Sequence, residues 1–209
     1  MTENARRAVD VLRDTGHFQW SVVPILLVVV YIYAGELERR RWSVVFAGLA
    51  LWGMDWFNEI WNGLVLHFTR HAPMWATPSG SAYVILVGLN IEISLMFAVM
   101  GVASVKLLPA DRNARVLGLP NRWFFAIALS WAAVGVEELL HAAGALTWDW
   151  HYWNAWFPWP IFLIGYLPFF IVAFWVHDMG DRRRQAVTVA TVLGVNAILL
   201  AVFLSLGWI

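Results

Sequence analysis

The chain has 209 residues, of which 61% are hydrophobic and 13% are charged, and its formal net charge is zero. This apolar share exceeds the roughly 45–50% of ordinary globular domains, which indicates a membrane protein, and the balanced charge excludes an overall basic surface for nucleic acid. Because cysteine is absent, disulfides, thiolate nucleophiles and cysteine-ligated zinc or iron–sulfur sites are excluded.

The N-terminal segment, residues 1–19, is predicted to lie at the membrane interface. It does not resemble a signal peptide, because charges interrupt it before any apolar stretch: Arg6, Arg7, Asp10, Arg13 and Asp14. A short amphipathic helix is expected instead, since four apolar residues share one helical face: Ala5, Ala8, Val9 and Leu12.

Residues 20–209 are expected to form a single transmembrane helical domain. Apolar segments long enough to cross a bilayer follow one another through this part of the chain. We therefore predict an all-α polytopic bundle of about six transmembrane helices. The predicted spans are residues 20–35, 42–68, 81–108, 123–146, 159–177 and 186–209.

The cations predict an orientation for this multi-pass bundle. Most of them fall in three connections, which contain Arg39–Arg41, then Lys106, Arg112, Arg115 and Arg122, and finally Arg182–Arg184. By the positive-inside rule these connections are cytoplasmic, and both termini are expected outside.

A tandem repeat of a two-helix unit is also suggested. Trp52 precedes Glu59 by the same spacing as Trp131 precedes Glu138, and a loop rich in tryptophan and proline follows each glutamate. Internal repeats of this kind are common in membrane folds. The repeat predicts equivalent, facing positions for Glu59 and Glu138.

Acidic residues and a histidine fall at similar depths in different predicted helices, given a rise of about 1.5 Å per residue. An acid at the centre of a membrane helix costs about 2.5–3.5 kcal/mol. Such groups must share protons, hydrogen bonds, a metal or a water-filled cavity, which favours a functional site. The predicted catalytic residues are Glu59, Glu138, Asp55, Glu92 and His141.

The surrounding residues predict a pocket for a hydrophobic small molecule. Amides can hydrogen-bond either form of a carboxyl group, and tryptophan faces stabilise cations. A carbocation formed by protonation would suit such a pocket, which favours acid–base cyclisation or isomerisation. The predicted substrate-binding residues are Asn58, Asn62, Trp52, Trp56, Trp61, Trp131, Trp148 and Glu137.

Three stretches resemble small integral-membrane isoprenoid enzymes. "WFNEIWN", residues 56–62, resembles the asparagine-, tryptophan- and glutamate-bearing helix of membrane terpene cyclases. Two further stretches are "EELLHAAGALTWDWHYW", residues 137–153, and "LPFFIVAFW", residues 167–175. Their order of glutamate, glycine, aromatic, proline and tryptophan residues is similar to that of carotenoid cyclases and hydratases. The resemblance implies a lyase or isomerase acting on an isoprenoid, with Glu59 and Glu138 as acid and base.

Two other classes of function stay open at this point. Glu138-x-x-His141 is an element of di-iron carboxylate bundles, and Glu59 and Glu92 would complete a divalent-metal site in a metal-dependent oxidoreductase. The acid–base reaction, in contrast, requires no cofactor. Intramembrane acids also mark proton relays, so a proton-coupled transporter or a non-catalytic membrane binding protein is the third alternative. A homodimer is compatible with each.

Overall fold

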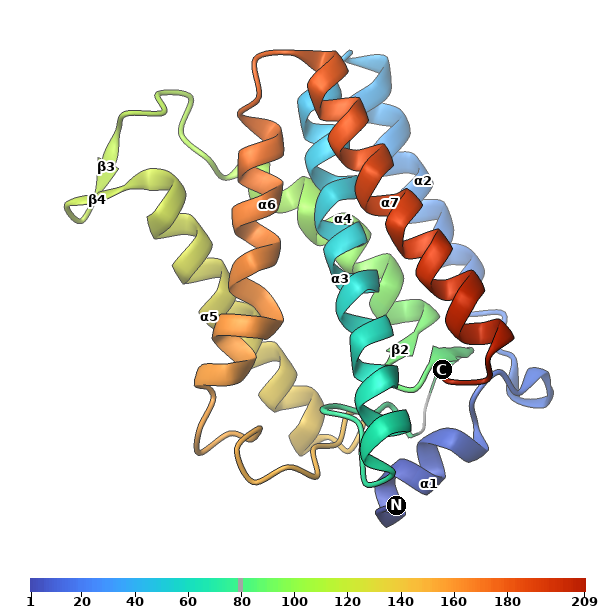
Figure 1. Cartoon of the computed structure of the whole chain (residues 1–209). Helices are drawn as coiled ribbons and strands as arrows, with labels where there is room; N and C mark the ends of the chain where they lie inside the picture. Colours follow the sequence, from blue (N-terminus) through green and yellow to red (C-terminus); the bar gives the residue numbers. More distant parts are fainter. Residues whose placement is uncertain (79–80) are drawn as a thin grey trace.

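The computed structural model describes residues 1–78 and 81–209 (Figure 1). Most of this part of the chain is helical, with two short β-hairpins. In chain order the elements are α1 (Glu3–Asp10), the 3₁₀-helix η1 (Thr15–His17), α2 (Val22–Glu38), α3 (Trp42–Thr69), β1 (Val84–Leu86), β2 (Leu89–Asn90), α4 (Ile91–Lys106), β3 (Arg115–Val116), β4 (Leu119–Pro120), α5 (Asn121–Ala142), the π-helix η2 (Ile161–Tyr166), α6 (Leu167–His177) and α7 (Arg182–Ser205).

Helix α3 is the central element and packs against α4, α6 and α7. Its contact with α4 is close because glycines face each other: a Cβ added at Gly101 would lie 2.8 Å from the backbone of Gly48. Helix α7 is held by Asn196, whose amide Nδ2 donates to the carbonyl of Gly53 at 2.6 Å. The polar groups of α3 are therefore surrounded by other helices.

The π-helix η2 interrupts the path into α6. Pro168 has no amide hydrogen, so it cannot donate to the carbonyl of Ile164 as a residue in an α-helix would. That carbonyl instead accepts a hydrogen bond from Asn58 Nδ2 of α3 at 3.1 Å. The irregular turn thus has a partner on the central helix, and it directs Gly165 and Tyr166 towards the interior.

The prediction of six membrane-spanning helices is wrong. Among the described residues, only α5 and α7 are long and apolar enough to cross a membrane by length and composition, and 28% and 11% of their most apolar stretches are buried. Helices α2 and α4 have only 17 and 16 residues. Helix α3 is long enough, but four polar residues make it less apolar: Asp55, Asn58, Glu59 and Asn62.

The predicted third span, residues 81–108, is also wrong in its first part. Residues 84–90 form the antiparallel hairpin β1–β2, and helix α4 begins only at Ile91. A second hairpin, β3–β4, precedes α5 in the same way. The first hairpin shortens α4, whereas α5 begins at Asn121, two residues before its predicted start.

The outer faces of α2 and α7 are apolar and exposed, as expected for surfaces that face lipid and not water. The large exposed side chains on these two helices are Val23, Ile25, Leu26, Leu27, Val28, Val30, Tyr31, Leu37, Val187, Val195, Ile198, Val202 and Leu204.

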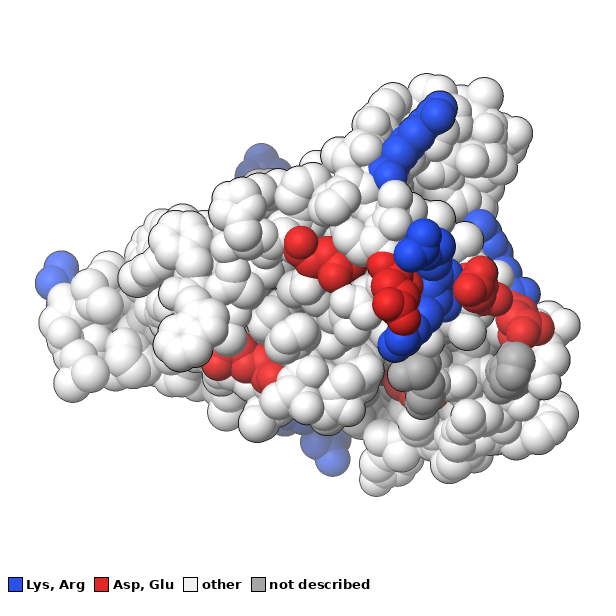
Figure 2. All heavy atoms as spheres, turned by 90° about the horizontal axis from the view of Figure 1, so that it is seen from below, with Lys and Arg blue, Asp and Glu red and all other residues white. Residues whose placement is uncertain are grey.

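The two ends of the bundle differ in character. The arginine-rich connections between α2 and α3, between α4 and α5, and between α6 and α7 share one end, which we call the arginine end (Figure 1). The opposite end, which we call the loop end, holds both termini, α1, and the segments 70–78, 81–83 and 143–160. Seen from the loop end, acidic and basic side chains lie close together over part of the surface (Figure 2).

Helix α1 is amphipathic, but its apolar face packs against the protein. Ala5 and Ala8 are completely buried, and Ala8 packs on Ala76 and Val87. The Thr2 hydroxyl donates to Asp149 Oδ2 at 2.5 Å, which ties this segment to the loop after α5. Helix α1 therefore covers the loop end, and its predicted location at a membrane interface stays a prediction.

Candidate functional site

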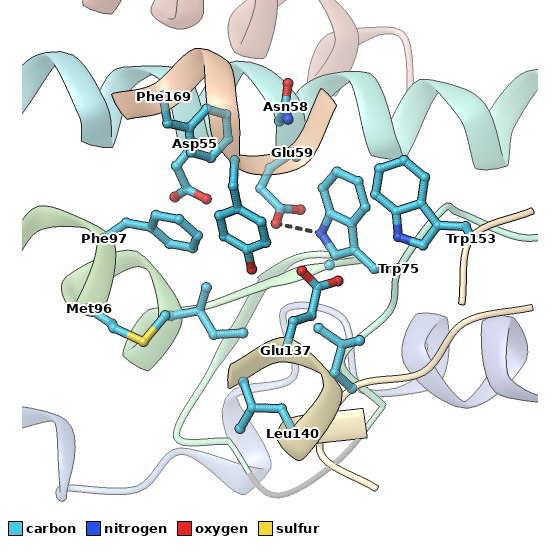
Figure 3. A pocket seen from close by; sticks show the side chains of 15 residues that line it. Asp55, Asn58, Glu59, Trp75, Met96, Phe97, Glu137, Leu140, Trp153 and Phe169 are labelled. Atoms are coloured by element: carbon cyan, nitrogen blue, oxygen red, sulfur yellow. Dashed lines mark hydrogen bonds between the residues drawn. The ribbon is translucent and has the colours of Figure 1, made fainter. Parts of the chain in front are cut away.

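Three buried carboxyl groups line one internal cavity between α3, α4, α5 and η2. Asp55, Glu59 and Glu137 are 2%, 3% and 6% exposed, and the cavity that they border has a volume of about 40 Å³ (Figure 3). The remaining described lining is apolar, aromatic or uncharged, and it contains no lysine, arginine or histidine: Asn58, Trp75, Gly88, Ile93, Met96, Phe97, Leu140, Leu146, Trp153, Gly165, Tyr166 and Phe169.

Helix α3 supplies two of the acids and also fastens the loop that covers them. Asp55, Glu59 and Asn62 lie on one face of α3 because their spacing follows the helical repeat. The Asn62 Oδ1 accepts from the backbone amides of Met74, at 2.7 Å, and Trp75, at 3.3 Å. Its Nδ2 donates to the Trp75 carbonyl at 2.8 Å. Asn62 is thus a structural anchor for Trp75.

This anchor brings the Trp75 indole over the first glutamate. Its Nε1 donates to Glu59 Oε1 at 2.7 Å (Figure 3). Gly88, in the turn between β1 and β2, leaves room for it: an added Cβ would lie 2.5 Å from Trp75 Nε1 and 2.4 Å from Asn62 Nδ2. The hairpin and the loop after α3 therefore position the hydrogen bond to Glu59 together.

The second glutamate is held in a parallel way. Trp148 Nε1, from the loop after α5, donates to Glu137 Oε1 at 3.0 Å. The Tyr166 hydroxyl of η2 interacts with the same carboxyl group. Each glutamate thus receives an indole N–H from the loop that follows its own helix.

The two tryptophan-bearing loops are joined directly. The amide of Ala76 donates to the Thr147 carbonyl at 3.0 Å, and the amide of Thr147 donates back at 2.9 Å. These residues are adjacent to Trp75 and Trp148. We call the paired segments 75–76 and 147–148 the strap. Within the strap, Trp75 lines the cavity and Ala76 packs on Ala8 of α1.

Several buried polar atoms of the cavity have no hydrogen-bond partner among the described residues. They are Asp55 Oδ2, Glu59 Oε2 and the Nε1 of Trp153, a residue that is only 1% exposed. An unsatisfied buried polar group costs about 1–3 kcal/mol. Because buried polar groups are nearly always paired in native proteins, this combination indicates room for a ligand or water.

The structure does not bring every predicted catalytic residue to this cavity. Asp55 and Glu59 line it, but Glu138 is half-buried on α5 and lies outside the lining. Glu92 accepts from the Ser81 hydroxyl at 2.8 Å and the Ala82 amide at 2.6 Å. His141 stacks on Trp148, with ring centroids 4.2 Å apart, and its Nδ1 lies 3.0 Å from the Leu146 carbonyl oxygen.

The four residues that were predicted to bind a metal do not lie together. Glu59 faces the cavity, whereas Glu92, Glu138 and His141 lie elsewhere and do not share its lining. Within residues 1–78 and 81–209, no group of three or more histidine, aspartate or glutamate side chains is arranged to hold a metal ion.

The predicted substrate-binding residues also separate into two groups. Asn58 and Glu137 line the cavity, and Asn62 and Trp148 support it from behind. The other predicted tryptophans pack elsewhere: Trp52 donates to the Ser94 hydroxyl at 2.9 Å, Trp56 contacts Trp52, Trp61 contacts Trp75, and Trp131 stacks on Phe162.

Sequence reasoning missed Trp75, Trp153 and Tyr166, which do line the cavity. Trp75 and Trp153 also stack on each other, with centroids 5.5 Å apart. The signal for the first two was their position in the tryptophan-rich loops. The signal for Tyr166 was Pro168, two residues later, which marks the irregular turn.

Comparison with known proteins is informative about the family. Residues 2–205 match a family described as an uncharacterized membrane protein family. An uncharacterized protein of Archaeoglobus fulgidus is 56% identical over 209 residues, which cover 100% of this chain and 99% of that protein. A second uncharacterized protein of the same organism is 53% identical over 53 residues, which cover 25% of this chain and 95% of that protein. No solved structure matches. The chain thus belongs to this uncharacterized membrane protein family.

Proposed function

We propose that the protein is a membrane enzyme that moves protons to and from a hydrophobic, isoprenoid-like substrate in the cavity of Asp55, Glu59 and Glu137. One observation carries the proposal. The three acids are buried around one cavity whose described lining contains no lysine, arginine or histidine.

Such an arrangement supplies both an acid and a base. Close carboxyl groups in a site of low dielectric constant, with no cation beside them, do not all carry charge, so they share protons. Pairs of titratable groups with different environments are the usual acid–base partners of enzymes. Here the Glu59 carboxyl group interacts with the Trp75 indole and the Asn62 amide, whereas Glu137 interacts with the Trp148 indole and the Tyr166 hydroxyl.

The reaction that fits is an isomerisation or cyclisation. A protonated carboxyl group donates its proton to one carbon of a double bond, which leaves a carbocation on the substrate. A second, ionised carboxyl group then removes a proton from a different carbon, so that no atoms are gained or lost overall. Aromatic faces in the lining, such as those of Trp75 and Phe97, stabilise the cation between the two steps.

The resemblance of "WFNEIWN" to membrane terpene cyclases supports an isoprenoid substrate and a role for Glu59. For the second acid we propose Glu137 in place of Glu138, because only Glu137 lines the cavity. A metal-dependent oxidoreductase and a transporter have no comparable observation in their favour.

The test replaces three glutamates by glutamine, one at a time. Glu59→Gln and Glu137→Gln are expected to abolish a modified lipid that accumulates in membranes expressing the wild-type protein, whereas Glu138→Gln retains it. Lipid extracts are compared by mass spectrometry at matched protein levels. An unchanged lipid product in Glu137→Gln would falsify the proposal.

We further propose that the arginine end is cytoplasmic and that both termini are outside. The positive-inside rule supports this, since the arginine-rich connections share one end. The chain lacks cysteine, so single cysteines report directly on exposure. With a membrane-impermeant maleimide on intact cells, Trp156→Cys at the loop end is expected to react and Gly180→Cys at the arginine end is not. The reverse pattern would invert the orientation.

A further inference from the structure

A wide groove lies beside the carboxylate cavity. It has a volume of about 660 Å³ and opens between α2, α4 and the end of α5. Its lining is apolar apart from Asn90 and Glu92, and those two are occupied: Asn90 accepts from the Ile93 amide as the N-cap of α4, and Glu92 binds the segment 81–82. The volume lies within the range of about 300–1,000 Å³ that is typical of small-molecule sites.

The groove and the cavity share a wall. Ile93 and Met96 of α4, Leu140 of α5, and Leu146 of the following loop line both spaces. Met96 is 40% exposed, and methionine side chains change shape easily because they are unbranched and flexible. A layer of apolar side chains is thus what separates the apolar groove from the three acids.

The cavity limits the size of any polar group that enters it. The cavity, at about 40 Å³, is much smaller than the groove, at about 660 Å³. A small polar end group therefore suits the cavity. The groove, in contrast, is large enough for a hydrocarbon chain.

The polar atoms that lack a hydrogen-bond partner determine which end group of a ligand the cavity can bind. Trp153 Nε1 requires an acceptor, whereas Asp55 Oδ2 and Glu59 Oε2 offer acceptors when ionised. A hydroxyl group both donates and accepts, so it satisfies both kinds of atom. A carboxylate cannot donate a hydrogen bond, and it would meet three other carboxyl groups without a cation.

We propose that the groove and the cavity together bind a single-chain hydrophobic alcohol. Its chain lies in the groove, and its hydroxyl group passes Met96 and Leu140 to reach the buried polar atoms of the cavity. This deepens the proposed function, on which it rests for the chemistry that follows, by naming the class of substrate.

Binding is measured with the purified full-length protein in detergent and with labelled hexadecan-1-ol. A saturated chain has no double bond to protonate, so binding is observed without turnover. Hexadecan-1-ol is expected to bind at least about tenfold more tightly than palmitate, which has the same chain length but a carboxylate that cannot donate a hydrogen bond. Tighter binding of hexadecylamine would show that the three acids bind a cation and would overturn the choice of an alcohol. Equal binding of palmitate overturns the proposal.

Neighbouring leucines provide a matched pair of variants. Leu140→Trp fills the shared wall and is expected to weaken binding of the alcohol by at least about tenfold. Leu139→Trp is the control, because Leu139 is 71% exposed and lines neither space. Met96→Trp, on the α4 side of the same shared wall, is measured in parallel in case Leu140→Trp misfolds. Wild-type affinity in the folded wall variants overturns the proposed route.

The two proposals fail separately. If the alcohol binds selectively but Glu137→Gln retains its lipid product, the acid–base function is wrong and the ligand class stands. If the alcohol does not bind but Glu137→Gln loses the product, the ligand class is wrong and the acid–base function stands.

Discussion

Acidic side chains are buried in two regions of the bundle, with opposite surroundings. At the arginine end, Asp178 accepts two hydrogen bonds of 2.9 Å from Arg122 and lies 3.1 Å from Arg112. Glu36 accepts a hydrogen bond of 2.6 Å from Lys106. In the cavity, Asp55, Glu59 and Glu137 have no cation among the described lining residues.

The difference separates structural acids from functional ones. Removing one partner of a buried ion pair is destabilising because the other charge is left alone. An acid that is buried without a cation, in contrast, lowers stability and is retained where function requires it. The following predictions test this distinction, starting with the largest effect.

Asp178→Asn is expected to lower the free energy of unfolding by about 3 kcal/mol, because it leaves the largely buried Arg122 without its bidentate partner. Asp55→Asn, which changes a more deeply buried acid without a cation, is expected to change it by less than about 1 kcal/mol. Denaturant titration in detergent measures both. A larger loss in Asp55→Asn would contradict the distinction.

Gly88→Ala is expected to cost about 2 kcal/mol, since the new methyl group collides with Trp75 and Asn62. It should also displace the indole from Glu59, which the fluorescence of the protein can report. Gly135→Ala is the control: no atom lies within 4 Å of its added Cβ, so it should stabilise α5 by about 0.5–1 kcal/mol. Equal effects at the two glycines would refute the close packing at Gly88.

Lowering the pH is expected to destabilise the arginine end before the rest of the protein. Burial acts to raise the pKa of Asp178, but the hydrogen bonds and charges of Arg122 and Arg112 outweigh it and lower that pKa. The hydrogen bond from Lys106 likewise lowers the pKa of Glu36. Because both folded-state pKa values lie below the unfolded ones, this stabilisation is complete above about pH 5 and is lost as the pH falls below about 4.

The check is the unfolding free energy measured between pH 3 and 7 for the wild type and Asp178→Asn. The variant lacks one of the two groups, so its loss on acidification should be smaller. An acid response as large as that of the wild type would mean that other groups are responsible.

Trp148→Phe should have a smaller effect on stability than Gly88→Ala, a loss of about 1 kcal/mol. It removes the indole hydrogen bond to Glu137 but keeps an aromatic ring against His141. Trp156→Phe, at a side chain that is 97% exposed, should leave stability unchanged. Thermal unfolding in detergent compares the pair, and a larger shift in Trp156→Phe would argue against the bond to Glu137.

Much of this site could be predicted from the sequence, because helical spacing alone brings polar groups together. Asp55, Glu59 and Asn62 share a face of α3 as expected. The choice between Glu137 and Glu138 was harder. The spacing of Glu138 and His141 favoured Glu138, whereas the buried face of α5 follows Ala126, Ser130, Val134 and Glu137. That stripe of small and apolar residues was the more informative pattern.

Contacts made by loops could not be predicted, because no local period describes them. Trp75 reaches Glu59 only after Asn62 has fastened its backbone and Gly88 has made room. Trp153 joins the lining from the far end of another loop. The two hairpins were also missed, although the turns Val87–Gly88 and Leu117–Gly118 preceded a helix in both cases. Residues 84–90 were predicted to be part of the span 81–108, whereas residues 115–120 were predicted to be part of a connection.

The π-helix η2 makes the cavity depend on chain length as well as on chemistry. A π turn holds one residue more than the α-helical turn that it replaces. Deleting one residue from Ile161–Tyr166 would restore a regular helix whose flanks keep their relative orientation, so the side chains of the former wide turn would change position. Tyr166 would then leave Glu137 although no functional group had been changed. A one-residue gap in an aligned relative at this position would therefore mark a protein with the same helices and a different site.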